Sequence, residues 1–317
     1  MTSVRHSTHS RVLRRLPATG LLAVALAVAL PAFAATPINE TRPIDPLGSI
    51  EIDNLKGLIQ VRVWDRPEVK IEGSLGEGVE KLAIEGDRND LSIKVRYPNR
   101  GSGIGFLAGG DKSEPTELRL TVPLRVALDI DAVSATVDVN GVASRELKID
   151  SVSGDVIVAG APREAEIESV SGDLRLTLNS AKVSAQTVSG DLDLRGRLSG
   201  EVDVETVSGK VDVAAHQTRL SRVSGNSVSG DLRVAGGLAD GAEVSLETVS
   251  GDVRLTLPSN VSANVHGQSF SGDLNAPGAQ IVRPKHGPGS SFEHRYGSGS
   301  AKVKIETFSG DATLQLE

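Results

Sequence analysis

The sequence of 317 residues contains no cysteine, one tryptophan and two tyrosines, and aromatic residues make up only 3% of it. Without cysteine the chain forms no disulfide bonds and no thiolate metal centre. With so few aromatic residues, its core has to be built from aliphatic side chains. The stability of this protein must therefore come from many small apolar contacts.

What the sequence does contain is a pentapeptide, [Ser/Thr]-[Val/Phe]-Ser-Gly-[Asp/Lys], which occurs eight times between residues 151 and 311. Its glycines are Gly154, Gly172, Gly190, Gly209, Gly230, Gly251, Gly272 and Gly310. The first six intervals between them are 18, 18, 19, 21, 21 and 21 residues. A nearly constant period of this length is typical of a solenoid, in which each repeat is one coil that buries its apolar face against its neighbours.

The residues around each glycine predict two short strands. Apolar residues stand five positions before the glycine and two and four positions after it, as Ile167, Leu174 and Leu176 do around Gly172. A spacing of two predicts half-buried strands, whereas a helix needs a spacing of three or four. We therefore predict an all-β fold, a single-stranded parallel β-helix or β-solenoid with coils of 18–21 residues and two short strands per coil. The glycine is expected to take a positive φ at the bend.

The first 34 residues are predicted to be a secretory signal peptide. Four arginines precede an apolar run over residues 21–30, and Ala32-Phe33-Ala34 forms an Ala-x-Ala cleavage site. The run is short for a membrane span, which favours a signal peptide over an anchor. The remaining chain is expected to divide into an N-terminal linker (35–47) and one β-solenoid domain (48–317). That domain comprises degenerate capping coils (48–140), regular repeats (141–275), a loop insertion (276–300) and a final coil (301–317).

The charge balance excludes one class of partner. The predicted signal peptide holds four of the 34 Lys and Arg residues and none of the 41 Asp and Glu residues. The rest of the chain thus has 30 basic and 41 acidic residues and a formal net charge of −11, which argues against nucleic-acid binding. The expected localisation is the periplasm, the cell surface or the extracellular space, with no transmembrane segment in the mature chain.

Several segments together resemble a known family. They are Val63-Trp64-Asp65-Arg66-Pro67-Glu68-Val69, the segment 118–123 that ends in Val-Pro, the repeated Val-Ser-Gly-Asp, and the closing Thr307-Phe308-Ser309-Gly310-Asp311. Through them, residues 48–317 resemble the bacterial putative-adhesin family numbered 4097 among the domains of unknown function. The resemblance implies an exported β-strand-repeat protein for which adhesion is proposed. It implies no catalytic residues and no cofactor.

An acidic residue follows the glycine in most repeats, and these residues are the candidate metal ligands. Stacked coils would place them about 4.8 Å apart, and Ca²⁺ would relieve the repulsion between them. The column consists of Asp155, Asp173, Asp191, Asp231, Asp252 and Asp273, and the sequence favours no bound metal in it. The favoured alternative is that each carboxylate accepts hydrogen bonds from N–H groups of the corner, which also tolerates Lys210 in the same column.

Two further columns consist of polar residues. Acids and amides stand four positions before the glycine, as in Glu168 and Gln186. The hydroxyl at the first position of each pentapeptide is expected to bond to its neighbours and to the corner backbone, rather than to form a surface array that binds a ligand.

A small basic and aromatic cluster stands out in the expected loop insertion. It consists of His286, His294, Arg295 and Tyr296, on a chain that is otherwise acidic. These residues form either a solvated loop or a contact site for an anionic envelope polymer or a partner protein.

The sequence leaves three classes of function open. The favoured one is an exported, non-enzymatic β-solenoid that acts as an adhesin, a scaffold or an envelope-associated binding module through its repetitive lateral faces. Its partner would be an envelope polysaccharide or an envelope protein. The alternatives are an envelope structural protein that assembles end to end through open terminal strands, and a carbohydrate-active β-helix enzyme. The even distribution of acids along columns disfavours the enzyme.

Overall fold

The structure, a computed structural model, describes residues 36–98 and 113–317 and consists of strands and connecting turns. Its 22 strands belong to one hydrogen-bonded sheet that contains parallel and antiparallel pairs. The predicted all-β class is confirmed. The described part of the chain contains no helix with the length and apolar character needed to cross a membrane. The predicted signal peptide lies outside the described residues.

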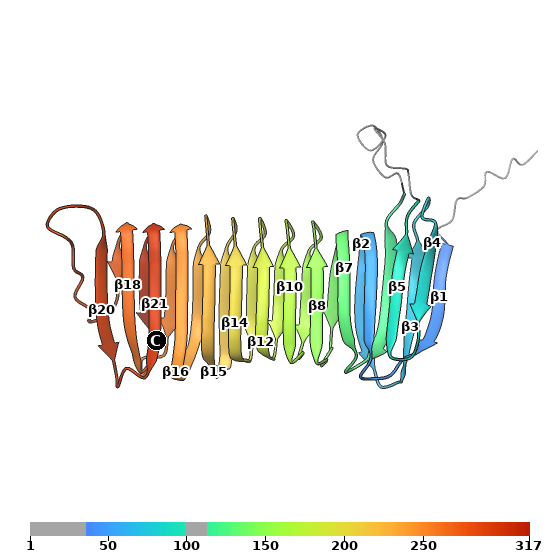
Figure 1. The fold of residues 1–317 in the computed structure, drawn as a ribbon, viewed down its shortest axis with the longest axis horizontal. Coiled ribbons are helices and arrows are strands. Elements are labelled where there is room, and N and C mark those ends of the chain that lie inside the picture. Colours follow the sequence, from blue (N-terminus) through green and yellow to red (C-terminus); the bar gives the residue numbers. More distant parts are fainter. Residues whose placement is uncertain (1–35, 99–112) are drawn as a thin grey trace, which may run out of the picture. The chain divides into compact units, whose positions relative to one another are not determined.

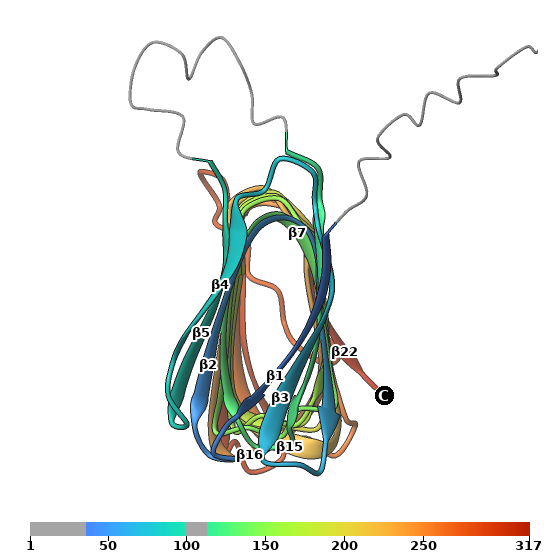
Figure 2. The same ribbon diagram turned by 90° about the vertical axis from the view of Figure 1, so that its right-hand side faces the viewer.

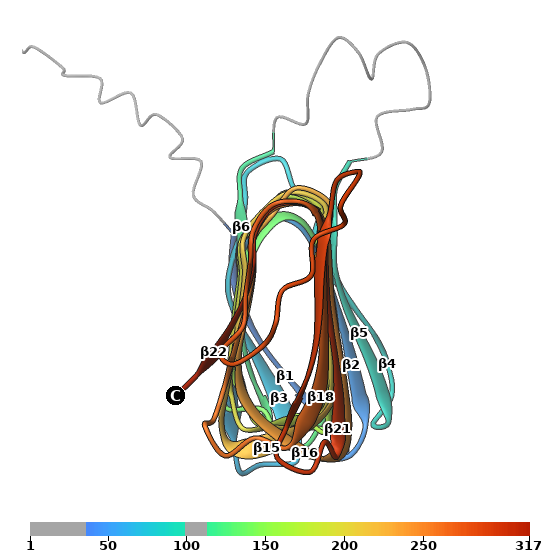
Figure 3. The ribbon, with the colours of Figure 1, turned by 90° about the vertical axis from the view of Figure 1, so that its left-hand side faces the viewer.

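Each repeat places one strand on each of two opposed faces, which are visible along the stack in Figures 2 and 3. The first face contains the strands that precede each repeat glycine, and they pair in parallel in the order β8, β10, β12 and β14 (Figure 1). Equivalent residues of successive coils are aligned, as Ile149, Ile167 and Ala185 are. The strands that lie wholly on this face are β4 (Lys81–Gly86), β5 (Asp90–Arg96), β8 (Glu146–Ser151), β10 (Glu164–Ser169), β12 (Ser180–Thr187), β14 (Leu198–Thr206), β18 (Ala263–Ser271), β20 (Ser290–Tyr296) and β21 (Ala301–Ser309).

The second face contains the strands that follow the glycine. They also pair in parallel through the regular repeats, with Val156, Leu174 and Leu192 aligned across three coils. The strands that lie wholly on this face are β1 (Thr36–Pro43), β3 (Glu68–Leu75), β6 (Thr116–Pro123), β9 (Val156–Gly160), β11 (Leu174–Leu178), β13 (Leu192–Gly196), β17 (Val253–Leu257), β19 (Leu274–Asn275) and β22 (Ala312–Leu316). Four longer strands pass through a corner and belong to both faces: β2 (Ser49–Trp64), β7 (Ala127–Asn140), β15 (Val211–Ser227) and β16 (Leu232–Ser250).

Columns of aliphatic side chains form the core between the two faces. The residue two positions after each glycine, from Val156 to Val253, is at most 1% exposed, as the alternation predicts. Each such side chain contributes about 1.5–3 kcal/mol by leaving water. One column lacks a side chain at Gly267, and Phe292 of β20 fills that space: its ring lies 2.1 Å from where a Cβ at Gly267 would be.

The order of coils in space differs from their order in the sequence at both ends. The strand β21 pairs with β16 on one side and with β18 on the other, so the coil of residues 301–316 lies between two coils that precede it in the chain. At the other end β2 lies between β5 and β7 in the same way. Figure 3 shows β18 and β21 side by side.

Antiparallel strands complete the ends of the stack. β4 pairs with β5, β1 with β3, and β20 with β18, all antiparallel. As a consequence, three segments differ from the division predicted from the sequence. Residues 36–43, expected in a linker, form β1, and part of the expected loop insertion (276–300) forms β20. The segment 301–317, expected as a final coil, lies inside the stack because its partners are on both sides.

Candidate functional site

The turn from the first face to the second, here called the repeat corner, presents an exposed apolar side chain in nine successive coils. The side chains stand at the second position of the pentapeptide or its equivalent and are 42–56% exposed. In order along the stack they are Val133, Val152, Val170, Val188, Val207, Val228, Val249, Phe308 and Phe270, and we call this set the valine ridge. At one end the rings of Phe308 and Phe270 stack with centroids 4.6 Å apart. A contiguous exposed apolar line of this kind is typical of an interaction surface, whereas isolated exposed valines are not.

The spacing of the ridge is fixed by the backbone of the corner. Within a coil, the N–H of Gly190 donates to the hydroxyl of Thr187 at 3.1 Å. Between coils, the N–H of Ser189 donates to the carbonyl of Val170 at 2.9 Å, and the same bond recurs along the stack. The first-position hydroxyls are at most 6% exposed. Seven of the eight bond to the corner backbone, whereas Thr206 Oγ1 has no partner among the described residues, and their burial prevents them from forming a surface array.

The repeat glycines are required for a reason other than the predicted one. Among these eight glycines, all within the described residues, Gly209 alone has a positive φ in the restricted region. The prediction of a positive φ at each bend is therefore wrong. Each glycine instead lies against the carbonyl of the neighbouring coil: a Cβ on Gly190 would be 2.1 Å from the oxygen of Gly172. Close backbone approach, rather than turn conformation, excludes a side chain here.

A shallow trough runs beside the ridge on the first face. Its two parts have volumes of about 580 Å³ and 450 Å³. One side is apolar and consists of ridge residues such as Val188 and Val207. The other side is the second polar column of the sequence, with Glu168, Gln186 and Glu205. The trough therefore offers alternating apolar surface and hydrogen-bonding groups, repeated at the spacing of the coils, about 4.8 Å.

The acidic column lies on the other side of the ridge and forms a hydrogen-bonded ladder. The carboxylate of Asp155 accepts the N–H of Asp173 at 3.2 Å, and Asp173 accepts the N–H of Asp191 at 3.1 Å. The second oxygen of Asp173 pairs with Arg175 at 2.9 Å. The ladder is interrupted at Lys210. The N–H of Lys210 donates to the carboxylate of Asp191, but the lysine side chain has no acceptor atom for the N–H of the next coil.

These bonds account for the acidic column without a cation. In the part of the chain that the structure describes, no three His, Asp or Glu side chains are grouped so that they could hold a metal ion. Cation binding by Asp155, Asp173, Asp191, Asp231, Asp252 and Asp273 is the alternative that the sequence disfavours, and it stays untested.

The basic and aromatic cluster is only partly brought together. The rings of His294 and Tyr296 meet edge to face with centroids 4.6 Å apart, on the side of β20 that turns toward the core. The hydroxyl of Tyr296 donates to the carbonyl of Pro277 at 2.7 Å. Arg295 alternates to the other side of the strand and donates to Asn264. His286 is exposed and belongs to the segment before β20. Contact with a partner by these residues stays a prediction.

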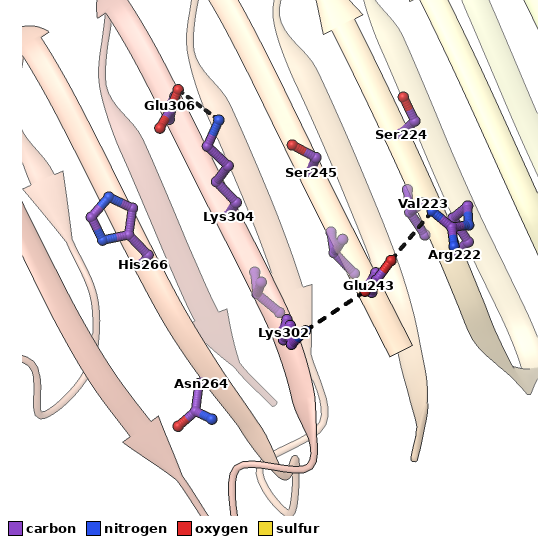
Figure 4. A pocket seen from close by; sticks show the side chains of 12 residues that line it. Arg222, Val223, Ser224, Glu243, Ser245, Asn264, His266, Lys302, Lys304 and Glu306 are labelled. Carbon is purple, nitrogen blue, oxygen red and sulfur yellow. Dashed lines mark ion pairs between the residues drawn. The ribbon is translucent and has the colours of Figure 1, made fainter. Parts of the chain in front are cut away.

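A further hollow, of about 610 Å³, lies on the first face near β18 and β21 (Figure 4). Its charged groups pair with one another: Glu243 lies 3.3 Å from Arg222 and 3.8 Å from Lys302. Lys304 donates to the adjacent Glu247 at 2.9 Å, and this bond lowers the pKa of Glu247 and raises the pKa of Lys304. The charges of this hollow are therefore compensated.

The sequence contains an indication of the valine ridge, but the regular alternation of apolar residues makes it difficult to recognise. The second position of the pentapeptide is always Val or Phe. An aliphatic residue at a fixed position in every repeat suggests burial, and the alternation changes phase at this point. The structure shows that these side chains point outward, because the corner residues on either side, such as Thr187 and Gly190, are the buried ones.

The stacked strands, the aligned columns and the absence of a gathered reactive site in the described residues define a class: an all-β repeat protein with periodic surfaces. The chain belongs to the Toastrack family, DUF4097, whose model matches residues 48–315. The recognition made from the sequence is thus confirmed.

Solved structures match most of the chain at low identity. A putative lipid binding protein from Parabacteroides distasonis is 11% identical, covers 88% of this chain and 96% of its own, and has a TM-score of 0.50. A putative adhesin from Parabacteroides merdae is 12% identical with the same coverages and a TM-score of 0.45. A putative cell adhesion protein from Clostridium sporogenes is 13% identical, covers 89% of this chain and 100% of its own, and has a TM-score of 0.23. No curated protein matches the chain.

Proposed function

We propose that this protein is an exported, non-enzymatic parallel β-solenoid that acts as a binding module of the cell envelope, as an adhesin or a scaffold. The predicted signal peptide supports a location in the periplasm or at the cell surface. The proposed partner is an extended envelope polysaccharide or envelope protein that lies along the trough beside the valine ridge.

The observation that carries this proposal is the ridge itself. Nine apolar side chains at a constant spacing remain 42–56% exposed in a protein that buries its other apolar columns almost completely. Covering the exposed half of one valine is worth about 1 kcal/mol. A partner that follows the stack gains this contribution in coil after coil, so weak equivalent contacts add up to useful affinity.

The distribution of the side chains whose pKa values are shifted supports a function without catalysis. Where a pKa is shifted, the causes are ion pairs, backbone hydrogen bonds or partial burial. The largest group of such side chains, Glu51, Lys94, Asp129, Asp131 and Lys148, lies on the outward, partly exposed side of neighbouring first-face strands. Arg62, for example, donates to Asp138 at 2.6 Å on the second face and lowers its pKa. An enzyme would gather such groups around one cleft.

The ends of the stack disfavour the end-to-end assembly alternative. Four strands have an open edge, and each carries a feature that hinders pairing with another copy. β1 has Pro37 and Pro43 near its ends, and β19 is only two residues long. β4 and β20 carry charged residues, among them Lys81 and Glu293.

The proposal is tested by placing charge on the ridge. The variant Val188→Glu with Val207→Glu replaces two neighbouring side chains of the trough. Losing about 2 kcal/mol of apolar contact predicts about 30-fold weaker retention on isolated cell envelopes of the native host. Repeating the measurement on protease-treated envelopes separates the two partners, because retention by a polysaccharide survives the treatment.

A matched control keeps the change of charge but moves it elsewhere. Ile157 is 40% exposed on the second face and Val282 is 58% exposed in the segment before β20. The variant Ile157→Glu with Val282→Glu should be retained like the unmodified protein. If the ridge variant also binds envelopes with unchanged affinity, the trough is not the binding surface.

A further inference from the structure

The other corner of each coil carries a groove rich in arginine. This return corner, where the chain leaves the second face and enters the first face of the next coil, lies at the opposite end of the strands from the valine ridge. The groove has a volume of about 650 Å³ and is lined by Arg125, Arg145, Arg163 and Arg197. Its lining, which belongs wholly to the described residues, includes no Asp or Glu. We call it the arginine groove.

The positive charges of the groove are poorly compensated. Arg145 approaches Glu146 at 3.9 Å, and Arg197 donates to an asparagine side-chain oxygen at 3.3 Å. Within residues 36–98 and 113–317, the side chains of Arg125 and Arg163 make no ion pair and no hydrogen bond. By comparison, Arg62, Arg175, Arg195 and Arg233 lie 2.6–2.9 Å from carboxylates. This groove therefore differs from the hollow of Figure 4, whose charges cancel.

The arginines are spaced by the stack. Arg125, Arg145 and Arg163 precede the first-face strands β7, β8 and β10, which are adjacent, and Arg197 precedes β14, two coils further on. Four intervals of about 4.8 Å give a row about 19 Å long. A single small anion could satisfy one or two of these groups, whereas a chain of anions could satisfy all four.

The backbone that carries the row is well fixed. The carbonyl of Arg163 accepts hydrogen bonds from the hydroxyl of Ser180 at 3.0 Å and from the N–H groups of Ala181 and Lys182 at 3.3 Å. The guanidinium groups are thus presented from a rigid edge, which lowers the entropy lost when a ligand binds.

The chemistry of the lining indicates the ligand. Guanidinium groups bind carboxylates, sulfates and phosphates through two parallel hydrogen bonds. Between the arginines the groove is lined by small residues, among them Ala143, Ala161 and Pro162, which leave room for a ring. The buried hydroxyl of Ser144, also in the lining, has no partner among the described residues. The lining contains no aromatic side chain on which a nucleobase could stack.

We propose that the arginine groove binds a linear anionic polysaccharide, with its acidic groups held by the row of guanidiniums. The trough beside the valine ridge carries carboxylates and would repel such a polymer, so the two corners serve different ligands. The inference does not depend on the function proposed for the ridge.

The test uses polygalacturonate, a linear polymer with one carboxylate per sugar, and isothermal titration calorimetry on the full mature chain. The variant Arg125→Gln with Arg163→Gln removes two charges that make no ion pair and no hydrogen bond among the described residues. The control variant, Arg175→Gln with Arg254→Gln, removes two charges from the outward side of the second face. We expect the groove variant to bind at least tenfold more weakly than the unmodified protein and the control to bind within about twofold of it.

Further binding measurements distinguish an anionic polysaccharide from other classes of ligand. Binding should weaken steeply between 50 mM and 300 mM salt, and galacturonate monomer and neutral dextran should not compete. No binding of polygalacturonate, or equal losses in the two variants, would overturn the proposal. Tighter arginine-dependent binding of a single-stranded oligonucleotide or of anionic phospholipid vesicles would overturn it as well. The ridge variant Val188→Glu with Val207→Glu should bind polygalacturonate normally, so the two proposals can fail separately.

Discussion

Replacing Gly190 by alanine tests why each repeat ends in glycine. The added Cβ would lie 2.1 Å from the carbonyl oxygen of Gly172 in the neighbouring coil. Carbon and oxygen atoms in proteins rarely approach closer than about 3.3 Å, so the corner has to open by about 1.2 Å. The atom in the way is backbone and cannot rotate aside, unlike the end of a flexible side chain.

The expected loss combines strain and weakened hydrogen bonds. Overpacking costs about 1–3 kcal/mol. The opening also stretches two bonds between coils, from Ser189 to Val170 and from Asp191 to Asp173, which are worth about 0.5–1.5 kcal/mol each. A total of about 3 kcal/mol predicts a melting temperature about 6–12 °C lower, measured by circular dichroism with urea unfolding as a second assay.

The matched control is another glycine of the same sheet. Gly237 has no positive φ, and a Cβ there would have its nearest neighbour at 3.6 Å, an ordinary contact. We expect Gly237→Ala to change stability by no more than about 0.5 kcal/mol. If Gly190→Ala melts within about 1 °C of the unmodified protein, close approach between coils does not explain the repeated glycine.

Three further predictions concern single side chains. Asp173→Ala should lose about 1 kcal/mol of stability in urea unfolding because the N–H of Asp191 loses its acceptor, whereas Asp173→Asn, which keeps an acceptor oxygen, should lose less. Burial raises the pKa of Asp131, so the charged form of this side chain disfavours folding at neutral pH. Asp131→Asn should therefore raise the melting temperature at pH 7 and have no effect below about pH 3. The same difference in melting temperature at both pH values would contradict this. Phe308→Ala removes the ring stacked on Phe270 and should cost about 1 kcal/mol, measured by urea unfolding.

The strands and the core could be predicted from the sequence because their pattern is local. Alternation around each glycine identifies the inward-facing residues, and Leu174 and Leu192 are buried as expected. The order of coils at the two ends could not be predicted this way. The positions of β2 and β21 depend on which strands pair over long distances, and each of these strands alternates like its neighbours.

The candidate surfaces, too, could be predicted only in part from the local sequence pattern. The acidic column was recognised in the sequence, together with the hydrogen-bonded alternative that the structure contains. The valine ridge was missed because an invariant aliphatic residue usually signals burial. The arginine groove was missed because its arginines stand outside the pentapeptide. Arg145 and Arg163 are one coil period of 18 residues apart, and the stacking of the coils brings them together with Arg197 at one groove.

The position of residues 301–316 has a consequence for how the protein is made. A chain that folds from its N-terminal end can add the coils after β7 one after another only as far as β17, because the next strands, β18 and β19, have their parallel partners in β21 and β22. That last stretch must be synthesised before the end of the stack can close. A product that stops at residue 300 would leave β16 and β18 with exposed edges, so newly made chains remain vulnerable to aggregation and proteolysis until synthesis has passed this segment.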